Sequence, residues 1–272
     1  MKRALPLVAL ILLAGCAFRQ ETQEMETMLV NGDFEADWGD EQSHDVLILR
    51  PGTIPYQSVV GNIFTPPNWM TWFRHDPGTW DQPEARDVWA TTYPRRVHGG
   101  AKAMLLFTFN RRHDAGYLQQ VRTEPGQQLR LTAWAHAWSN HDLEGHHGCA
   151  DDGRCSCGVG REVVAIAADD IPRLNGDPWN DAVGNFLFVV GIDPTGGIDA
   201  RASTVVWGAP YAIYNGYARQ LSVETMAQGE IATVFLRSTT VWPFKHNDAM
   251  WDDAVLTTVH RVFLPIVKQE AQ

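Results

Sequence analysis

The sequence is short of positive charge. Its 272 residues include 22 Lys and Arg against 32 Asp and Glu, which gives a formal net charge of −10. Nucleic-acid binding depends on Lys and Arg contacts to phosphates, and an acidic surface repels those phosphates. We therefore expect no nucleic acid among the partners of this chain.

Long apolar runs and familiar catalytic motifs are also missing. Beyond the first 15 residues, no stretch is apolar enough to cross a membrane as a helix. The chain contains no Gly-x-Ser-x-Gly elbow, no His-Glu-x-x-His motif and no phosphate-binding loop. No pair of carboxylates stands out as a catalytic acid and its partner. These absences favour a protein that is not an enzyme.

Cysteine is scarce, with four residues in the chain, and the first of them, Cys16, follows the parts of an export signal. Lys2 and Arg3 supply a positive start, and the apolar run over 5–13 is too short to span a bilayer stably. Residues 13–16, Leu-Ala-Gly-Cys, resemble the lipobox of bacterial lipoproteins. The resemblance implies a signal peptide over 1–15, a lipid anchor on Cys16, a spacer up to residue 27, and a position outside the cytoplasm at the cell envelope. An ordinary cleaved signal peptide is the alternative.

The other cysteines, Cys149, Cys155 and Cys157, lie in a polar segment, 140–161, that also contains histidines. In an oxidising compartment we expect a disulfide from Cys149 to one of the other two, because a bridge across a single intervening residue is strained. One thiol then stays unpaired. A metal site from these cysteines and histidines is an alternative, although the spacing matches no common zinc motif. A third possibility is neither arrangement.

Sustained helical periodicity is absent, and short alternating or β-branched runs are separated by Gly, Pro, Asn and Asp. This pattern predicts an all-β sandwich. Two long turn-rich segments, 140–161 and 169–184, are expected to be loop insertions. The clearest predicted strands are Ala101–Phe109, Gly116–Val121, Gln128–Trp138, Glu162–Ala168, Asn185–Ile192, Tyr217–Glu224, Ile231–Arg237 and Met250–Thr257.

The strand predicted over Gln128–Trp138 is unusual on both faces. Side chains alternate along a strand, so the small and apolar residues from Leu129 to Ala137 share one face. The opposite face carries two tryptophans and a histidine, Trp134, His136 and Trp138, where a half-buried strand would place small polar groups. That face is either covered by the loop that follows or lines a groove.

Five motifs, in order, resemble the carbohydrate-binding modules of the CenC type. They are Leu29–Glu35 (LVNGDFE), Asn68–Trp72 (NWMTW), Val97–Ala103 (VHGGAKA), Tyr117–Ala133 with its Gln-Gln-Val and Pro-Gly pairs, and Trp251–Leu256 (WDDAVL). The resemblance covers residues 28–258 and leaves a tail over 259–272. It implies a jelly-roll β-sandwich of the galactose-binding-domain type, here with long loop insertions.

The resemblance also implies a structural calcium ion where the opening and closing segments converge. The matching positions are Glu35, with Asp33 nearby, and Asp253. Calcium prefers carboxylate and carbonyl oxygens. Strict alternation would place Asp252 and Asp253 on opposite faces, so that only one of them points to such a site. The alternative is that backbone amides satisfy these carboxylates.

Sugar binding requires flat aromatic platforms with polar partners, and the chain has 11 tryptophans. Seven of them lie close to Arg, His, Asp, Asn or Gln in the sequence: Trp72, Trp80, Trp89, Trp134, Trp138, Trp207 and Trp242. The alternative for each is a place in the core. We select as the predicted ligand-binding set Trp134, His136, Trp138, Arg130, Gln120 and Trp72.

The sequence therefore predicts a lipid-anchored, extracytoplasmic module that binds a polysaccharide or an envelope glycan without cleaving it. Aromatic stacking and hydrogen bonding would supply the affinity. A structural or adhesive surface protein that binds proteins or its own copies is the alternative. A glycan-active hydrolase is the third hypothesis, because two carboxylates at a suitable separation can hydrolyse glycosides.

Overall fold

The computed structural model describes residues 27–37, 43–140, 186–213, 216–241, 243–244 and 246–259. Within these ranges the regular structure is β-strand, apart from one 3-10 turn, η1 (Pro94–Arg96). No helix in the described part is long and apolar enough to span a membrane. The all-β class predicted from the sequence is confirmed.

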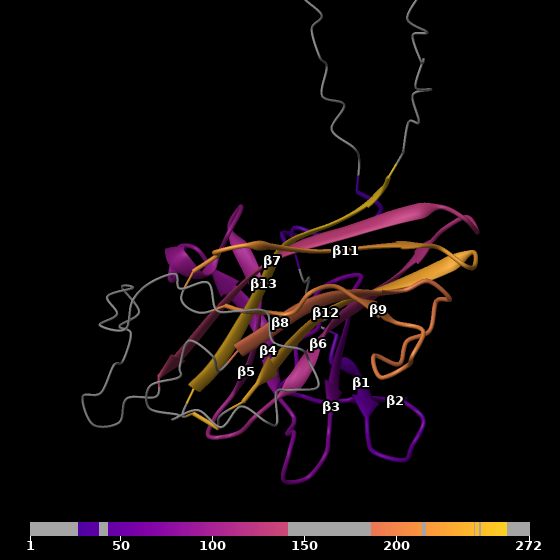
Figure 1. Cartoon of the computed structure of the whole chain (residues 1–272). Coiled ribbons are helices and arrows are strands. Elements are labelled where there is room, and N and C mark those ends of the chain that lie inside the picture. The colour runs from indigo at the N-terminus through magenta and orange to yellow at the C-terminus, as the bar shows by residue number, and fades with distance from the viewer. Residues whose placement is uncertain are drawn as a thin grey trace, which may run out of the picture.

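The strands form two sheets (Figure 1). The large sheet has the order β10 (Tyr211–Ala212), β8 (Phe186–Asp193), β12 (Ile231–Thr240), β6 (Asp114–Arg122), β3 (Met70–Arg74), β1 (Asp45–Leu49) and β2 (Tyr56–Val59), with β9 (Val206–Trp207) also beside β8. The small sheet has the order β11 (Gln220–Met226), β7 (Gln128–Asn140), β13 (His246–Thr258), β5 (Lys102–Thr108) and β4 (Glu84–Trp89).

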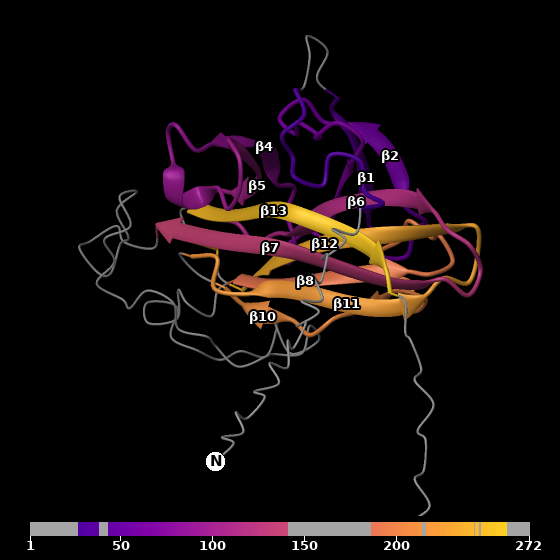
Figure 2. The same ribbon diagram turned by 90° about the horizontal axis from the view of Figure 1, so that it is seen from above.

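The chain winds between the sheets in the manner of a jelly roll. From β5 to β8, successive strands alternate between the small and the large sheet, and β11, β12 and β13 alternate again. The pairs within the sheets are antiparallel except for β1 beside β3. Viewed from above, β7, β11 and β13 lie across β8 and β12 (Figure 2). The predicted jelly-roll β-sandwich is confirmed.

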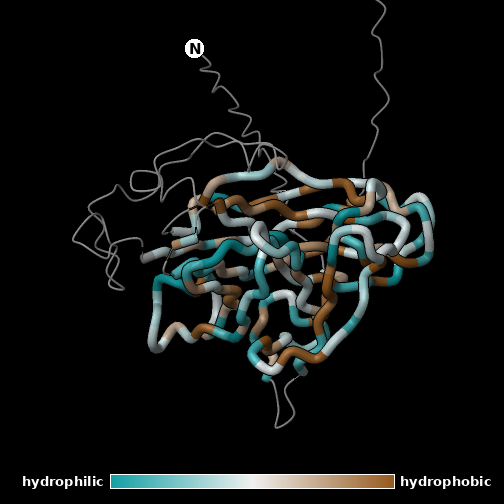
Figure 3. The backbone as a smooth tube through the Cα atoms, turned by 90° about the horizontal axis from the view of Figure 1, so that it is seen from below, coloured by the Kyte–Doolittle hydropathy of each residue, from teal (hydrophilic) through white to brown (hydrophobic). Residues whose placement is uncertain are grey.

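The interior between the sheets is filled by every second side chain of the strands. Leu129, Leu131 and Ala133 of β7 have no exposed surface, and the face predicted to be apolar is the core face. Aromatic rings meet them from both sheets, as where Phe188 packs edge-on against Trp251 with ring centroids 5.2 Å apart. Hydrophobic stretches follow the strands, whereas hydrophilic stretches gather in the peripheral loops (Figure 3).

The opening segment and the last strand pair with each other. The backbone N–H of Met28 donates to the carbonyl of Leu256, and that of Ala254 donates to Gly32, each at 2.8 Å. Phe34 turns into the core at a φ of 58° and has no exposed surface. The two ends of the described chain therefore lie side by side (Figure 1).

Each predicted strand that falls on described residues is present, with shifted ends. Glu162–Ala168 lies outside the described residues, as do the two predicted insertions. The prediction omitted β3 and the two-residue strands β9 and β10, and it also omitted β1, β2 and β4. β1 is a short continuous apolar run, β2 is an exposed edge strand, and β4 mixes charged and apolar residues. β1, β2 and β4 do not show the alternation on which the prediction relied.

Neighbouring positions on β7 test which face is the core. Leu131→Ala removes a fully buried side chain, and we expect it to lower the free energy of unfolding by about 2–5 kcal/mol. Arg130→Ala, one residue away, removes a side chain that is 50% exposed, and should change it by less than about 0.5 kcal/mol. Urea denaturation of both variants measures the difference. Equal losses would contradict the assigned face.

Candidate ligand-binding grooves

Two open grooves lie on opposite outer faces of the sandwich. The one on the large sheet, about 540 Å³ in volume, is lined by side chains that include Trp72, Arg74, Asp114, Trp207 and Arg237. We call it the Trp207 groove. The one on the small sheet, about 550 Å³, is lined by Trp138, Arg86, Arg96, Phe107, Phe109 and Asp248 among others. We call it the Trp138 groove.

Two indoles in the Trp207 groove rest on glycines of the large sheet. Trp207 lies opposite Gly191 of β8 in the ladder, and a Cβ atom there would collide with the indole. Gly116 of β6 lies opposite Trp72, where a Cβ atom would collide with the Leu236 carbonyl and would lie 3.1 Å from Trp72 Nε1. Trp207 is half-buried, whereas Trp72 is fully buried and its Nε1–H has no hydrogen-bond partner. The bare backbone thus lets both rings lie close to the sheet.

A buried carboxylate holds two arginines beside these rings. Asp114 has no exposed surface and accepts hydrogen bonds from Arg237 Nε at 2.7 Å and Nη2 at 2.9 Å. It also accepts one from Arg74 Nη1 at 3.0 Å and one from the Thr239 hydroxyl at 3.1 Å. Strands β3, β6 and β12 are adjacent, so the network crosses the floor of the groove. The Arg237 guanidinium also lies 5.4 Å from the Trp207 ring centroid.

The charge on Asp114 is stabilised despite its burial. Burial by itself would raise the pKa of this carboxyl, but the charges and hydrogen bonds of Arg237, and then of Arg74, outweigh it and hold the pKa below its usual range. Asp114 is therefore ionised at neutral pH. Among the described residues, this one carboxylate accepts hydrogen bonds from both guanidiniums.

The wall of the groove is fixed by a third arginine. Arg201 donates Nε to Oδ1 of Asp199 and Nη2 to Oδ2, both at 2.9 Å. It also donates to the carbonyls of Arg50 at 2.6 Å and Thr53 at 3.0 Å, on the turn between β1 and β2. These contacts join the segment over 199–202 to the edge of the large sheet.

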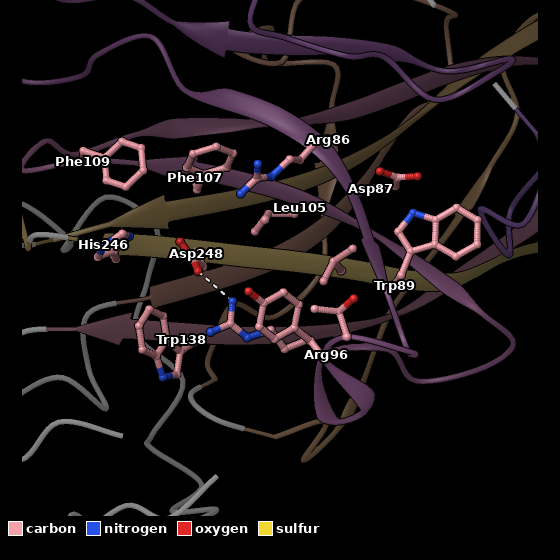
Figure 4. Close-up of a pocket in the computed structure, with 13 residues that line it drawn as sticks. Arg86, Asp87, Trp89, Arg96, Leu105, Phe107, Phe109, Trp138, His246 and Asp248 are labelled. Atoms are coloured by element: carbon pink, nitrogen blue, oxygen red, sulfur yellow. Dashed lines mark hydrogen bonds and ion pairs between the residues drawn. The ribbon is translucent and has the colours of Figure 1, made fainter. Parts of the chain in front are cut away.

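The Trp138 groove is built around a buried ion pair (Figure 4). Arg96 Nη1 lies 2.9 Å from Oδ2 of Asp248, and the guanidinium packs 4.5 Å from the ring centroid of Trp138. Farther along, the Arg86 guanidinium lies 4.9 Å from the ring centroid of Phe107. The Trp138 ring is thus in contact with a side chain of its own chain.

The predicted aromatic face of β7 is only partly open. Trp138 lines the groove, but Trp134 is stacked by the His98 ring at a centroid distance of 4.2 Å. His136 is 1% exposed and packs 5.3 Å from the ring of Tyr217. The expectation that Trp134, His136 and Trp138 form one platform is therefore wrong, because the turn at His98 and the Tyr217 segment cover two of them.

The remaining predicted ligand residues lie apart from this face or at its far end. Arg130 is on β7 and lies 3.8 Å from Glu224 of β11. Gln120 is exposed on the large sheet and donates to the carbonyl of Gly196 at 2.8 Å. Trp72 lines the Trp207 groove. The six predicted residues do not gather in one site.

The predicted calcium ligands Glu35 and Asp253 approach one turn, at Gly99 and Gly100. A Cβ atom on Gly100, whose φ is +64°, would collide with the Glu35 carboxylate, and one on Gly99 would collide with that of Asp253. The third predicted ligand, Asp33, accepts a hydrogen bond from the backbone N–H of Glu35 at 3.4 Å.

Backbone amides donate to the Glu35 carboxylate. Its Oε1 accepts hydrogen bonds from Ala101 at 2.8 Å and from Lys102 at 2.9 Å. Calcium requires roughly six to eight oxygen ligands, and the described residues contain no group of three or more Asp, Glu, His or Cys side chains that could hold a metal ion. The side chains do not by themselves form a calcium site, so the calcium ion stays a prediction.

A β-bulge changes the expected alternation at Asp252 and Asp253. The register of β13 against β7 shifts between Asp252 and Val255, and Asp253 has a φ of 45°. Both carboxylates therefore reach the same turn. Asp252 Oδ2 accepts from the backbone N–H of His98 at 2.8 Å, and Asp253 Oδ2 lies 2.6 Å from His98 Nδ1. The expectation of opposite faces is wrong because it assumed a regular strand.

Several predictions fall on residues outside the described ranges. They are the lipid anchor on Cys16, the cysteine pairing or metal site at Cys149, Cys155 and Cys157, and the position of Trp242. These stay predictions.

No protein-family model and no curated protein matches the sequence. Among solved structures, TmCBM61 in complex with β-1,4-galactotriose aligns at 11% identity over 86% of this chain and 99% of that chain, with a TM-score of 0.41. A CBM4 structure aligns at 12% identity over 71% and 95%, with a TM-score of 0.33. The CBM22-1 and GH10 modules of a Clostridium thermocellum endo-1,4-β-D-xylanase 10B, complexed with xylohexaose, align at 10% identity over 73% and 27%, with a TM-score of 0.35.

Likenesses of this degree assign no ligand to the chain. Its own strand pairing defines a jelly-roll β-sandwich protein, and the Trp207 and Trp138 grooves lie on its opposite outer faces.

Sequence reasoning did not select Arg74, Asp114 or Arg237, and it noted Trp207 without choosing it. One signal was present for Arg74, which follows Trp72 by two positions and therefore shares its face. Asp114 and Arg237 meet only through the pairing of β6 with β12, across more than a hundred residues of chain. No local pattern marks such a pair.

Two buried histidines should make the free energy of unfolding sensitive to acid. Burial, with a smaller effect of Arg96, lowers the pKa of His136 to about 3, and burial lowers that of His113 to about 4. An unfolded histidine takes up its proton near pH 6.5. Below that pH the unfolded chain binds more protons, so these residues lower the free energy of unfolding as the pH falls.

The variant His136→Leu isolates one of these contributions. Between pH 6 and 4, its stability should decline less steeply than that of the parent, by at most about 1.4 kcal/mol per pH unit. Asp252 acts in the opposite sense, because burial and then Asp253 raise its pKa to about 7, but both proteins share that contribution. Urea denaturation at each pH measures the difference, and parallel curves would contradict the assignment.

Proposed function

We propose that this chain binds a glycan, without cleaving it, in the Trp207 groove. The observation that carries the proposal is a half-buried indole laid on the bare backbone of Gly191 beside a bonded arginine cluster. Trp207 contacts Gly191, Phe235 and Arg237 of the strands beneath it, and it packs against the apolar cluster that includes Ala200 and Val205. Its outward side is the side that faces the groove.

Stacking and hydrogen bonding would each contribute to recognition of the sugar. An indole buries the apolar face of a sugar ring, while arginine N–H groups donate to ring hydroxyls. The groove volume of about 540 Å³ lies in the range of about 300–1,000 Å³ that is usual for small-ligand sites. The arginines are already fixed by Asp114, so a ligand would lose little binding energy in ordering them.

The carboxyl groups of the groove favour binding without hydrolysis. Glycoside hydrolysis uses two carboxyl groups, one of them protonated to act as the acid. Among the described lining residues of the Trp207 groove, Asp114 is the one carboxylate, and its lowered pKa keeps it ionised. Its oxygens are moreover occupied by Arg74, Arg237 and Thr239.

The location of the protein is a second part of the proposal. The lipobox-like residues 13–16 support export, cleavage before Cys16 and a lipid on that cysteine. The glycan would then be a component of the cell envelope or an external polysaccharide. A module of this kind holds a binding surface at the boundary of the cell.

Trp207→Ala tests the groove. We expect affinity for a bound oligosaccharide to fall at least about tenfold, because removing an aromatic platform removes the stacking that supplies about 1.4 kcal/mol or more. A glycan array identifies the ligand and calorimetry measures the change. Trp207→Phe should retain part of the affinity.

The matched control is Trp89→Ala, which removes a 43% exposed tryptophan that lines the Trp138 groove. It should leave binding within about twofold of the parent. Loss in Trp89→Ala with full binding in Trp207→Ala would move the site to the other face. A parent protein that binds no glycan would favour the structural or adhesive alternative.

Cys16→Ser tests the anchor. Replacing the thiol removes the atom that receives the lipid, so the protein should move from the membrane fraction to the soluble fraction of the expressing bacterium. Immunoblotting of the two fractions measures this. Cys157→Ser is the control and should stay with the membrane. An unchanged distribution of Cys16→Ser would contradict the anchor.

A further inference from the structure

We propose that strand β2 pairs with the β2 strand of a second copy of this chain, so that the large sheets of two molecules join edge to edge. β2 lies at the end of the large sheet, beside β1 (Figure 1). The inference goes beyond glycan binding and does not rest on it. It is drawn from the open backbone groups, the exposed apolar side chains and the charges at this edge.

The backbone of β2 presents unpaired hydrogen-bonding groups. The N–H of Val60 donates to the carbonyl of His44 at 3.0 Å, in the same register in which β2 pairs with β1. Because backbone groups alternate in direction along a strand, those of Gln57 and Val59 point away from β1. No described strand pairs with this side of β2. Such an edge is a template for another strand.

The other long edge strands are protected in ways that β2 is not. β4 has the sequence EARDVW, with three charged residues, and its Ala85 already forms backbone hydrogen bonds with Asn62 and Phe64. β11 carries Glu224, which lies 3.8 Å from Arg130. Charged side chains on an edge strand oppose pairing with a further chain. Residues 51–61, which include β2, contain no charged residue.

The charges favour a second copy as the occupant of this edge. The chain has a formal net charge of −10, so two copies repel each other across an average pair of surfaces. The uncharged segment 51–61 avoids that repulsion. Beside it, exposed Asp45 lies at one end of β1, and Arg50 follows the other end. Antiparallel pairing reverses one copy, which brings the Arg50 end of each copy beside the Asp45 end of the other.

One register satisfies all the outward groups of β2. When Gln57 of each copy lies opposite Val59 of the other, every outward N–H meets an outward carbonyl, and Ser58 lies on the twofold axis. The register that places Gln57 opposite itself sets Val59 against Pro55, which has no N–H to donate. The geometry therefore selects the first register.

The same register covers exposed apolar side chains. Val59 is 71% exposed, and Tyr56 is 37% exposed. Tyr56 lies opposite Ile48 of the core cluster in the β1–β2 ladder, so its ring is at the margin of the core. In the dimer Tyr56 would face Val60 of the other copy, and such aromatic and β-branched cross-strand pairs stabilise sheets.

Ser58→Cys tests the register by cross-linking. Residues opposite each other in a non-hydrogen-bonded pair have Cα atoms about 4.5 Å apart, within the span of about 4.4–6.8 Å of a disulfide. Oxidation of the full chain should therefore produce a covalent dimer on a non-reducing gel, in excess of the amount that the parent forms. Gln57→Cys is the control, because its Cα atoms would lie roughly 9 Å apart, too far for a disulfide.

Sedimentation velocity of the full chain, in detergent and reductant, measures the association without a cross-link. We expect a dimer at concentrations of roughly 1–200 μM, because a contact between short strands is smaller than a standard interface. Val59→Lys places a charge on the exposed edge and should raise the dissociation constant at least about tenfold. Met226→Lys, at a 54% exposed position of β11, is the matched control and should leave the constant within about twofold.

Melting temperatures check that the variants are folded. Should Val59→Lys be unstable, Gln57→Pro serves in its place, because it removes an outward N–H and no bond to β1. It should weaken the dimer to the same degree.

The outcomes are separate from those of glycan binding, since no measurement contains a saccharide. A parent that stays monomeric at about 200 μM overturns the second copy as the occupant of this edge. A dimer that Val59→Lys leaves intact overturns β2 as the contact. A cross-link in Gln57→Cys without one in Ser58→Cys overturns the register.

Discussion

The two sheets share one packed interior, and every strand that contributes to it must turn alternate side chains outward. Leu236 and Ala115 fill the core, so their neighbours Arg237 and Asp114 face away from it. Both grooves are therefore consequences of the packing of the core. A charged cluster can occupy the middle of the large sheet without entering the interior. The floor of the Trp207 groove is consequently as rigid as the sandwich beneath it.

The Asp114 cluster couples this floor to the register of the strands. A buried carboxylate is costly unless it is paired, and removing one partner of such a pair leaves an uncompensated charge. Asp114 on β6 meets Arg74 from β3 on one side and Arg237 from β12 on the other. A slip of either neighbour by one residue would turn its arginine to the core. The contacts that shape the groove thus also specify the pairing of its strands.

Sequence reasoning succeeded where the information is local. The alternation of Leu129, Leu131 and Ala133 identified the core face of β7, because period and burial are linked within a single strand. It failed where distant segments meet. Trp134 and His136 were expected to be open, but the rings of His98 and Tyr217 pack against them. Asp253 does not lie on its expected face, because a bulge interrupts the strand. Neither a covering turn nor a bulge produces a periodic sequence pattern from which it could be predicted.

The aromatic residues of the two faces differ in what contacts them. On the small sheet, Trp134 is stacked by His98, and Trp138 is in contact with Arg96. These rings already have a face covered by side chains of their own chain. On the large sheet, Trp207 also contacts side chains of its own chain, Phe235 and Arg237, and it lies against the bare backbone of Gly191. A stacking ligand needs a ring with a face turned to the groove, and the glycine at position 191 provides that arrangement as much as the tryptophan does.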